Sequence, residues 1–379
     1  MLKVGVWGPG SMGVVALRGV IDHPELQLVD VVVHSDANAG RDAGELCGIA
    51  PVGVVATQDP AAMLAGDADA VVYAAAANLR PLDAVEDMVS ILRAGKNVVS
   101  CSVVPLVFPD AVDAAFTEPL RQAAIDGGVS FFTTGIDSGF ANDVLPLMLT
   151  GVSRVIESVR VTEMFNYATY PDRSAVYEIL GFGQQPDYPA FAAQPGIFTF
   201  GWGPVLHQLA AGLGVKIDNI EEANERIPAG DPFDTPTGHI AAGTIAAMRS
   251  TLTGYVGGKP TFVLDHVTRM RDDIAPDWPQ PASASSRRTS VTARRPAAGC
   301  TAWRSRVPQH AVRIRDGRRP RPRPGGAHRG LLEDGQRHPR RVRRRARAAL
   351  RDGPAAHHRE RPGACGAGPA ARQPAVLAR

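Results

Sequence analysis

Residues 8–13 read Gly-Pro-Gly-Ser-Met-Gly, and they join an apolar run at residues 2–7 to a helical pattern at residues 14–20. In such a strand-turn-helix unit, the first glycine allows a tight turn and the second lets the backbone approach a pyrophosphate. The third lets the helix pack closely against the strand. Backbone amides at the start of the helix favour a phosphate group. We therefore predict that a dinucleotide binds at Gly8, Gly10, Ser11, Met12 and Gly13.

Alternating strand and helix patterns continue beyond this loop. Apolar, β-branched runs at residues 26–33, 70–77, 97–101 and 129–133 are typical of strands buried on both faces of a parallel sheet. Helical patterns lie between them at residues 82–94 and from Thr117, as N-cap, to Gly127. This order predicts an α/β fold, with a doubly wound parallel sheet of the Rossmann type in a domain of residues 1–145.

The pattern changes in residues 146–280, which we interpret as an α+β domain for substrate binding and dimerisation. Residues 158–165 alternate like an antiparallel strand, and residues 244–256 and 261–270 flank Gly257-Gly258-Lys259-Pro260 like a hairpin. A helix is expected at residues 204–213, followed by an acidic stretch at residues 218–225. We therefore expect a second, mixed or antiparallel sheet.

The last 99 residues differ in composition. Residues 1–280 carry 16 basic and 33 acidic side chains, whereas residues 281–379 carry 25 arginines, no lysine and 5 acidic side chains. Such a tail is expected to be disordered. It is rich in Arg, Pro, Ala and Gly, which GC-rich codons encode out of frame, so we hypothesise a frameshift near residue 280 that leaves a sheet edge unpaired. The alternative is a basic arm that binds nucleic acid, which we consider unlikely because it would also use lysine.

The type of dinucleotide depends on the end of the second strand, where an acidic residue would bind the ribose hydroxyl of NAD. His34 and Ser35 occupy that place, with Arg41 downstream, and this favours NADP(H). NAD(H) remains the alternative if Asp36 reaches the ribose. Since ligands gather at the carboxyl ends of parallel strands, three further residues are expected near the nicotinamide ribose: Ala76, Asn78 and Ser102.

Side chains for catalysis are expected at the start of the second domain and in a segment of small residues. The catalytic candidates are Glu163, Tyr167 and His239, and the substrate-binding candidates are Ser138, Asn142, Asp143 and Asn166. Carboxylate, phenol and imidazole groups can exchange protons with a substrate. For Tyr167 and His239 a packing or surface role is the alternative.

Other features limit the class of protein. Four cysteines without paired spacing argue against a disulfide framework or a zinc site, and we expect no metal. No signal peptide or membrane span is recognisable, so a cytoplasmic protein is expected. The exposed hairpin makes a homodimer plausible, and the partner expected for the site is a small molecule.

Together with the glycine loop, residues 135–146, Gly-Ile-Asp-Ser-Gly-Phe-Ala-Asn-Asp-Val-Leu-Pro, carry a resemblance over about residues 1–280. The chain resembles proteins with a dihydrodipicolinate-reductase-like N-terminal domain, most closely the 2,4-diaminopentanoate-dehydrogenase-like amino-acid dehydrogenases. The resemblance implies an NAD(P)H-dependent oxidoreductase that acts on the CH–NH2 or C=N group of a small amino or imino acid. One alternative is a 4-hydroxy-tetrahydrodipicolinate reductase, which the lack of a His-His pair before Gln280 disfavours. Another is a nonenzymatic nucleotide-binding protein with a degenerate second domain.

Overall fold

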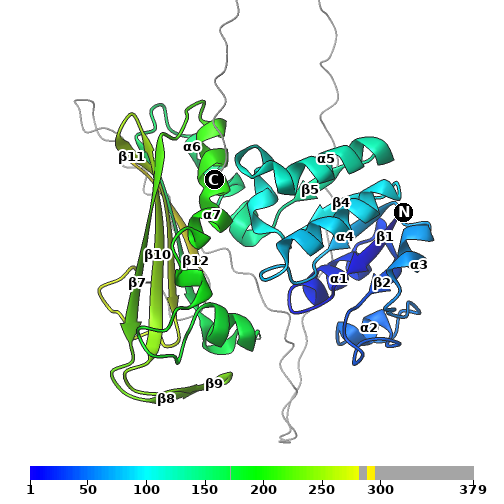
Figure 1. Cartoon of the computed structure of the whole chain (residues 1–379), viewed down its shortest axis with the longest axis horizontal. Helices are drawn as coiled ribbons and strands as arrows, with labels where there is room; N and C mark the ends of the chain where they lie inside the picture. Colours follow the sequence, from blue (N-terminus) through cyan, green and yellow to red (C-terminus); the bar gives the residue numbers. More distant parts are fainter. Residues whose placement is uncertain (171, 281–287, 295–379) are drawn as a thin grey trace, which may run out of the picture. The chain divides into compact units, whose positions relative to one another are not determined.

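The computed structural model describes residues 1–170 and 172–280 and the backbone of residues 288–294. Its first sheet has five parallel strands in the order β2-β1-β3-β4-β5. Helices connect successive strands, and the α/β fold expected from the sequence is confirmed (Figure 1). The strands are β1 (Leu2–Trp7), β2 (Leu26–Val32), β3 (Ala70–Tyr73), β4 (Asn97–Ser100) and β5 (Phe131–Thr133), and the helices are α1 (Gly13–Asp22), α2 (Ala43–Leu46), α3 (Pro60–Ala65), α4 (Pro81–Arg93) and α5 (Ala114–Gly127).

Buried apolar side chains hold these helices on the sheet. Tyr73 of β3 and Met88 and Ile91 of α4 are completely buried in one cluster, which explains the helical spacing of apolar residues in α4. The predicted start of α5 at Thr117 is wrong. The helix begins at Ala114 because Asp113 accepts a hydrogen bond from the amide of Ala115 and so acts as the N-cap.

The second sheet is mixed and has the order β12-β6-β11-β10-β7. The antiparallel pairing predicted for β6 holds only against β12, because β6 runs parallel to β11. The stretch 218–225 lies largely within a strand, β7, and the helix predicted at 204–213 begins earlier, at Ile197. The elements are β6 (Ser158–Asn166), β7 (Asn219–Pro228), β8 (Phe233–Thr235), β9 (Gly238–Ile240), β10 (Ile245–Val256), β11 (Lys259–Arg269), β12 (Arg288–Arg294), α6 (Val144–Thr150) and α7 (Ile197–Gly212), with short helical turns η1 (Val104–Val107), η2 (Pro109–Ala111), η3 (Ile136–Phe140), η4 (Tyr167–Thr169), η5 (Ala175–Ile179) and η6 (Phe191–Ala193).

The predicted hairpin joins β10 to β11 through only two residues. Gly257 and Gly258 have φ angles of 57° and 72°, in the left-handed region that suits a two-residue hairpin turn. Lys259 already pairs with Val256, so the connection is shorter than the four residues expected from the sequence.

The expected unpaired edge of the second sheet is also a wrong prediction. Residues 288–294 form β12, which pairs with β6 along its whole length. The predicted disorder of the tail otherwise concerns residues 281–287 and 295–379, which lie outside the described residues. The frameshift near residue 280 has no support from the described residues and stays a hypothesis. No helix in the described part of the chain is long and apolar enough to span a membrane.

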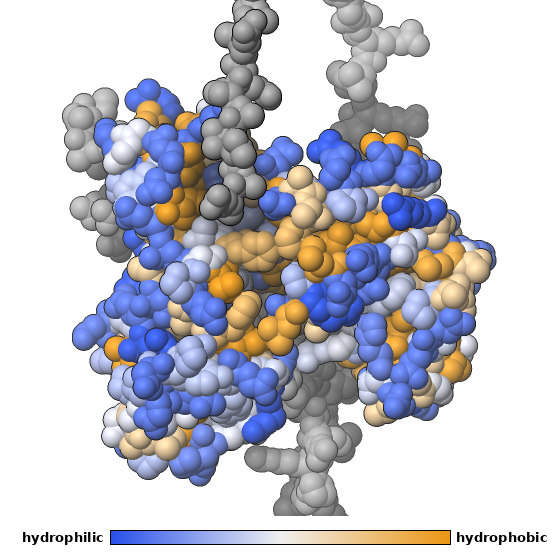
Figure 2. All heavy atoms as spheres, in the orientation of Figure 1, coloured by the Kyte–Doolittle hydropathy of each residue, from blue (hydrophilic) through white to orange (hydrophobic). Residues whose placement is uncertain are grey.

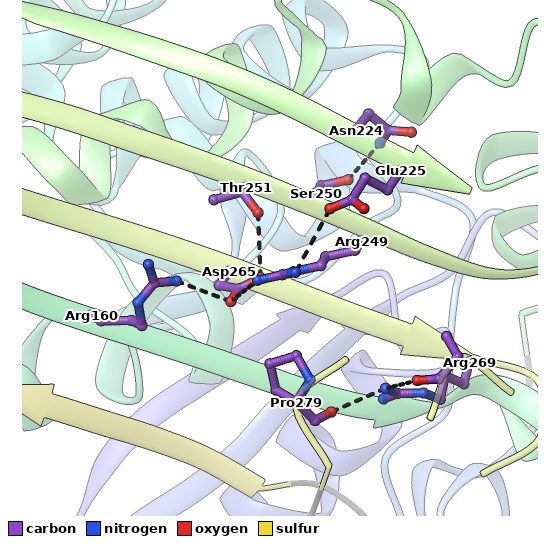
Figure 3. A network of polar contacts seen from close by, with 10 residues as sticks. Arg160, Asn224, Glu225, Arg249, Ser250, Thr251, Asp265, Arg269 and Pro279 are labelled. Carbon is purple, nitrogen blue, oxygen red and sulfur yellow. Dashed lines mark hydrogen bonds and ion pairs between the residues drawn. The ribbon is translucent and has the colours of Figure 1, made fainter. Parts of the chain in front are cut away.

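An ionic network fixes the central strands of the second sheet (Figure 3). Asp265 of β11 is 1% exposed and accepts two hydrogen bonds from Arg249 of β10, at 2.8 and 3.0 Å. Arg160 of β6 donates a third at 3.1 Å. Adjacent residues of a strand point to opposite faces, so these bonds hold the strand that presents His266 on the other face.

The segment after β11 is also tied to the sheet. Arg269 is 3% exposed and donates to the carbonyl oxygens of Ile274, Ala275 and Pro279. Its guanidinium lies 5.9 Å from the ring centre of Trp278. These contacts hold residues 274–279 against the end of β11.

Candidate active site

The glycine loop has the close contacts that its sequence predicts. A Cβ atom on Gly8 would lie 2.4 Å from the backbone of Ala75, and one on Gly13 would lie 2.3 Å from the carbonyl oxygen of Gly8. Gly8 also has a φ of 82°, which other residues rarely adopt. A Cβ on Gly10 would meet no atom within 4 Å. Gly8 and Gly13 therefore shape the loop, and open space remains where a phosphate would approach Gly10.

Backbone amides at this loop are available to a ligand. Within the described part of the chain, the amides of Ser11 and Met12 donate to no protein acceptor, while Gly10 donates to Gly8 at 2.8 Å. They lie directly before α1, whose N-terminal end carries a partial positive charge. The loop thus fits the pyrophosphate of a dinucleotide.

The residues after β2 are exposed and polar. His34 accepts a hydrogen bond from the indole of Trp7 at 3.4 Å, and Arg41 donates to Asn38 at 3.4 Å. Asp36 accepts a hydrogen bond from Gln58, which also binds the carbonyl oxygen of His34. The Asp36 carboxylate is therefore engaged by Gln58. Ser35 caps the following turn by accepting from the amide of residue 37.

The other residues predicted near the nicotinamide follow β3 and β4. Ala76 and Asn78 are exposed directly after β3, and Ser102 is half-buried after β4 and donates to the carbonyl oxygen of Tyr73 at 3.2 Å. Since β3 and β4 are parallel neighbours, their carboxyl ends share one edge of the sheet. The contact of these three residues with a cofactor stays a prediction.

Three ionisable side chains meet beyond the end of β5. Asp137 belongs to η3, Glu163 to β6 and His266 to β11. The Nε2 atom of His266 lies 3.3 Å from Asp137 Oδ2 and 3.5 Å from Glu163 Oε2. Their side chains are only 13–25% exposed. We name Asp137, Glu163 and His266 the acid–base cluster.

Two neutral groups bind the Asp137 carboxylate. Trp202 of α7 donates its indole N–H to Asp137 Oδ1 at 2.9 Å, and the side-chain amide of Asn142 donates to the same oxygen. Burial by itself raises the pKa of Asp137. The charge of His266 and the hydrogen bonds with Glu163 and Trp202 outweigh it, so the pKa lies well below its usual range. Asp137 is therefore ionised at neutral pH.

Hydrogen bonding in the cluster is incomplete. His266 Nε2 is buried and makes no hydrogen bond of acceptable angle within the described structure, although both carboxylates are at ion-pair distance. The imidazole therefore lies within reach of both carboxylates. Asn142 Oδ1 and Ser138 Oγ are likewise buried without a partner among the described residues.

Aromatic rings surround the cluster. Phe198 and Trp202 of α7 lie edge-on to His266, with ring centres 5.0 and 5.2 Å away. On β6, Phe165 follows Glu163 by two residues and so lies on the same face, and it contacts Tyr167 at 4.7 Å between ring centres. The site therefore combines two acidic groups with apolar walls.

The remaining predicted residues lie in varied positions. Tyr167 contacts Tyr170 and Phe182 in an aromatic group, and Asn166 donates to Asp272 at 2.7 Å. Asp143 accepts from the amide of Val144, and burial raises its pKa. His239 lies on β9, 58% exposed, with Nδ1 2.7 Å from Asp234. The structure places Glu163 and Asn142 at the acid–base cluster, whereas the contact described for the His239 imidazole is with Asp234.

Three residues of the site were not predicted from the sequence. His266 has no motif around it, and only the pairing of β6 with β11 places it beside Glu163. Asp137 lies within the quoted motif, but its contacts come from strands far along the chain. Trp202 gave no signal, because a tryptophan in an apolar helix usually indicates packing.

The three side chains of the acid–base cluster each offer one atom that could bind a small cation. Atoms of Asp137, Glu163 and His266 lie within 4.8 Å of one another. However, Asp137 Oδ1 already accepts two N–H groups, from Trp202 and Asn142, and N–H groups do not coordinate cations. The other oxygen, Oδ2, faces His266, and the lack of a metal stays a prediction.

Comparisons with known proteins agree with both parts of the chain. Residues 2–101 match the family model of the dihydrodipicolinate reductase N-terminus, and residues 140–277 match the 2,4-diaminopentanoate dehydrogenase C-terminal domain. An amine dehydrogenase from Streptomyces virginiae is 41% identical over 283 residues, covering 74% of this chain and 79% of the relative. A 2,4-diaminopentanoate dehydrogenase from Acetoanaerobium sticklandii is 26% identical over 173 residues, covering 45% of this chain and 48% of the relative.

A solved structure supports the fold. An amine dehydrogenase from Mycobacterium smegmatis superposes with a TM-score of 0.63 at 21% identity, covering 77% of this chain and 83% of the other. At this level of identity the comparison concerns the fold alone.

Proposed function

The chain belongs to the family of NAD(P)-dependent amino-acid dehydrogenases with a dihydrodipicolinate-reductase-like N-terminal domain, and on that premise we propose that it deaminates a small amine by oxidation. The C-terminal match favours this reaction over the lysine-pathway reductase, which was the alternative from the sequence. The observation that carries the proposal is the half-buried cluster of Asp137, Glu163 and His266.

The glycine loop would hold the dinucleotide. Gly10 leaves room for the pyrophosphate, and the amides of Ser11 and Met12 would donate to it. When bound, the nicotinamide accepts a hydride from the carbon that bears the amine. Ala76, Asn78 and Ser102, at the carboxyl ends of β3 and β4, would support its ribose.

The acid–base cluster would handle the protons of the reaction. An ammonium substrate must lose one N–H proton before the C–H hydride leaves, and the product is then an iminium ion. Water adds to its carbon, and ammonia leaves when the nitrogen regains a proton, which gives the carbonyl product. Glu163 and His266 are the groups that accept and return these protons. Asp137 would remain ionised and stabilise the protonated His266.

The surroundings of the cluster favour an amine over an α-amino acid. No Lys or Arg in the described structure contacts Asp137 or His266, so neither residue has beside it a cation that would pair with a substrate carboxylate. The charge of Asp137 favours an ammonium group, and the rings of Phe198 and Trp202 suit apolar substituents.

The experiment that tests the function uses pairs of substrates with the same carbon skeleton. Purified chain is incubated with NADP+ or NAD+ and either an alkylamine or the corresponding α-amino acid, and reduced nicotinamide and ammonia are measured. We expect both products from the amine, and a kcat/KM at least about 10-fold lower for the amino acid, which corresponds to about 1.4 kcal/mol. Preference for the amino acid would contradict the proposed substrate. No turnover by a chain that binds the cofactor would contradict the proposed reaction.

We propose NADP(H) as the preferred cofactor. The support is that His34, Ser35 and Arg41 are exposed after β2, whereas Asp36 is engaged by Gln58. A 2′-phosphate would then meet donors and a cation instead of a free carboxylate.

We also propose a homodimer. Large apolar side chains are exposed along η3 and α6, namely Ile136, Phe140, Val144 and Met148. Figure 2 shows that hydrophobic residues also gather in patches on the face viewed. Sedimentation of the chain and of Met148→Glu tests this: a dimer that the substitution dissociates supports the proposal, and a monomer at all concentrations contradicts it.

A further inference from the structure

Trp202 contacts two members of the acid–base cluster with two different parts of its side chain. Its indole N–H donates to Asp137 Oδ1 at 2.9 Å. Its ring lies edge-on to His266, at 5.2 Å between ring centres and 81° between the planes. One side chain of α7 therefore contacts both the ionised carboxylate and the imidazole beside it.

Helix α7 holds Trp202 in this position. The helix buries Val205, Leu206 and Leu209, which are at most 1% exposed. They pack in a hydrophobic core with residues of the second sheet such as Val161 and Leu264. Phe198 lies one turn before Trp202, its ring centre 5.0 Å away, and contacts the same imidazole. The indole is thus fixed by the packing of the helix, without depending on a ligand.

The two donors to Asp137 Oδ1 cannot titrate. Trp202 and Asn142 are neutral at all relevant pH values and donate N–H groups, so they stabilise the ionised carboxylate more than the protonated form. The titratable groups that face Asp137 are His266 of β11 and Glu163 of β6. Of these three groups, Asp137 is the one that accepts hydrogen bonds from both neutral donors.

We infer that Trp202 is a positioning residue, which keeps Asp137 ionised and the ring of His266 in place, so that the exchangeable proton stays on Glu163 and His266. The kinetic consequence of this inference rests on the proposed function. The hydrogen bond and its effect on the charge of Asp137 do not.

The first test measures unfolding and needs no activity. Urea unfolding midpoints at neutral pH are compared for wild type, Trp202→Phe, Asp137→Asn and the double variant. Trp202→Phe keeps a ring but removes the N–H donor. Since a bond to an ionised acceptor is about twice as strong as a neutral one, the loss on Trp202→Phe should be about twofold larger in the wild-type background than in the Asp137→Asn background. Equal losses in both backgrounds would overturn the inference, because they would indicate packing alone.

The second test follows the pH dependence of kcat/KM. Loss of the N–H donor raises the pKa of Asp137, so the carboxylate takes up a proton at higher pH, and the activity of the variant should fall at higher pH than that of wild type. Trp278→Phe is the matched control, because it removes an indole beside Arg269, and its acid limb should stay unchanged. Trp202→Leu, which also removes the ring, should lower kcat further.

The two tests separate the inference from its premise. If Trp202→Phe costs more stability in the wild-type background than in the Asp137→Asn background, and the acid limb moves upward, both are supported. Equal stability losses in the two backgrounds contradict the positioning role whatever the kinetics show. A larger stability loss in the wild-type background with an unchanged acid limb would show that Trp202 stabilises the charge on Asp137. That charge would then not serve catalysis, and this would contradict the proposed role of the cluster.

Discussion

Glu163 of β6 and His266 of β11 are register partners in a parallel strand pair, and Glu163 Oε2 lies 3.5 Å from His266 Nε2. Strand residues alternate between faces, so a slip of one residue would replace His266 by Asp265 or Val267. The pairing of two strands about one hundred residues apart in sequence therefore brings this carboxylate and imidazole together.

The glycine loop can be tested with two glycines that both have open space around them. A Cβ on Gly10 or on Gly19 meets no protein atom within 4 Å, but only Gly10 faces the proposed phosphate site. Gly10→Ala should fold normally and raise the dissociation constant of NADPH by at least about 10-fold, or about 1.4 kcal/mol. Gly19→Ala, in the middle of α1, should bind normally and gain up to about 1 kcal/mol of stability. Titration by fluorescence and thermal unfolding measure both, and equal affinities would contradict this placement of the phosphate.

Asp265 should matter greatly for stability. Asp265→Asn removes the charge that pairs with Arg249 and Arg160, and a broken buried pair costs about 3–5 kcal/mol. Glu225→Gln is the matched control, since Glu225 is 56% exposed and lies 3.7 Å from the same Arg249, and it should cost less than about 1 kcal/mol. Urea unfolding measures both. Similar losses would show that the Asp265 network does not hold the sheet.

Acid should weaken the fold partly through Asp137. Its pKa is lowered on folding, so its contribution is fully present above the ordinary value of 3.8 and is lost as the pH falls through the folded-state pKa. Asp137→Asn removes this contribution of the ionised carboxylate to stability. The variant should therefore lose less stability than wild type between pH 6 and the acid range below 3.8, as measured by urea midpoints. Parallel loss in both proteins would contradict the depressed pKa.

Cofactor preference should depend on Arg41. Arg41→Ala should raise the KM for NADP+ in amine oxidation by about 10-fold, as expected for a charge pair with phosphate worth about 1.4 kcal/mol, and leave the KM for NAD+ unchanged. Arg18→Ala, which removes an exposed arginine paired with Asp22 on α1, serves as the control. If Arg41→Ala affects both cofactors equally, the 2′-phosphate does not contact Arg41.

Local patterns predicted the first sheet and the glycine loop because both depend on neighbouring residues. The turn at Gly8 and the buried strands are properties of short segments. The pairing of β6 with β11 and the contact of Trp202 with Asp137 depend on long-range packing, which no spacing in the sequence encodes. Glu163 was predicted from its place on the first strand of the second domain, whereas His266 needed the register of that strand with β11.

The most direct test of the acid–base cluster is the rate of cofactor reduction in a single turnover. Glu163→Gln is compared with Glu157→Gln, which changes an exposed glutamate just before β6. With an amine substrate, Glu163→Gln should slow reduction by about 10²–10⁴-fold, the usual contribution of a general acid or base, with unchanged NADPH affinity. Glu157→Gln should react like wild type. A Glu163→Gln variant that reduces the cofactor at the wild-type rate would contradict the role of this cluster in catalysis.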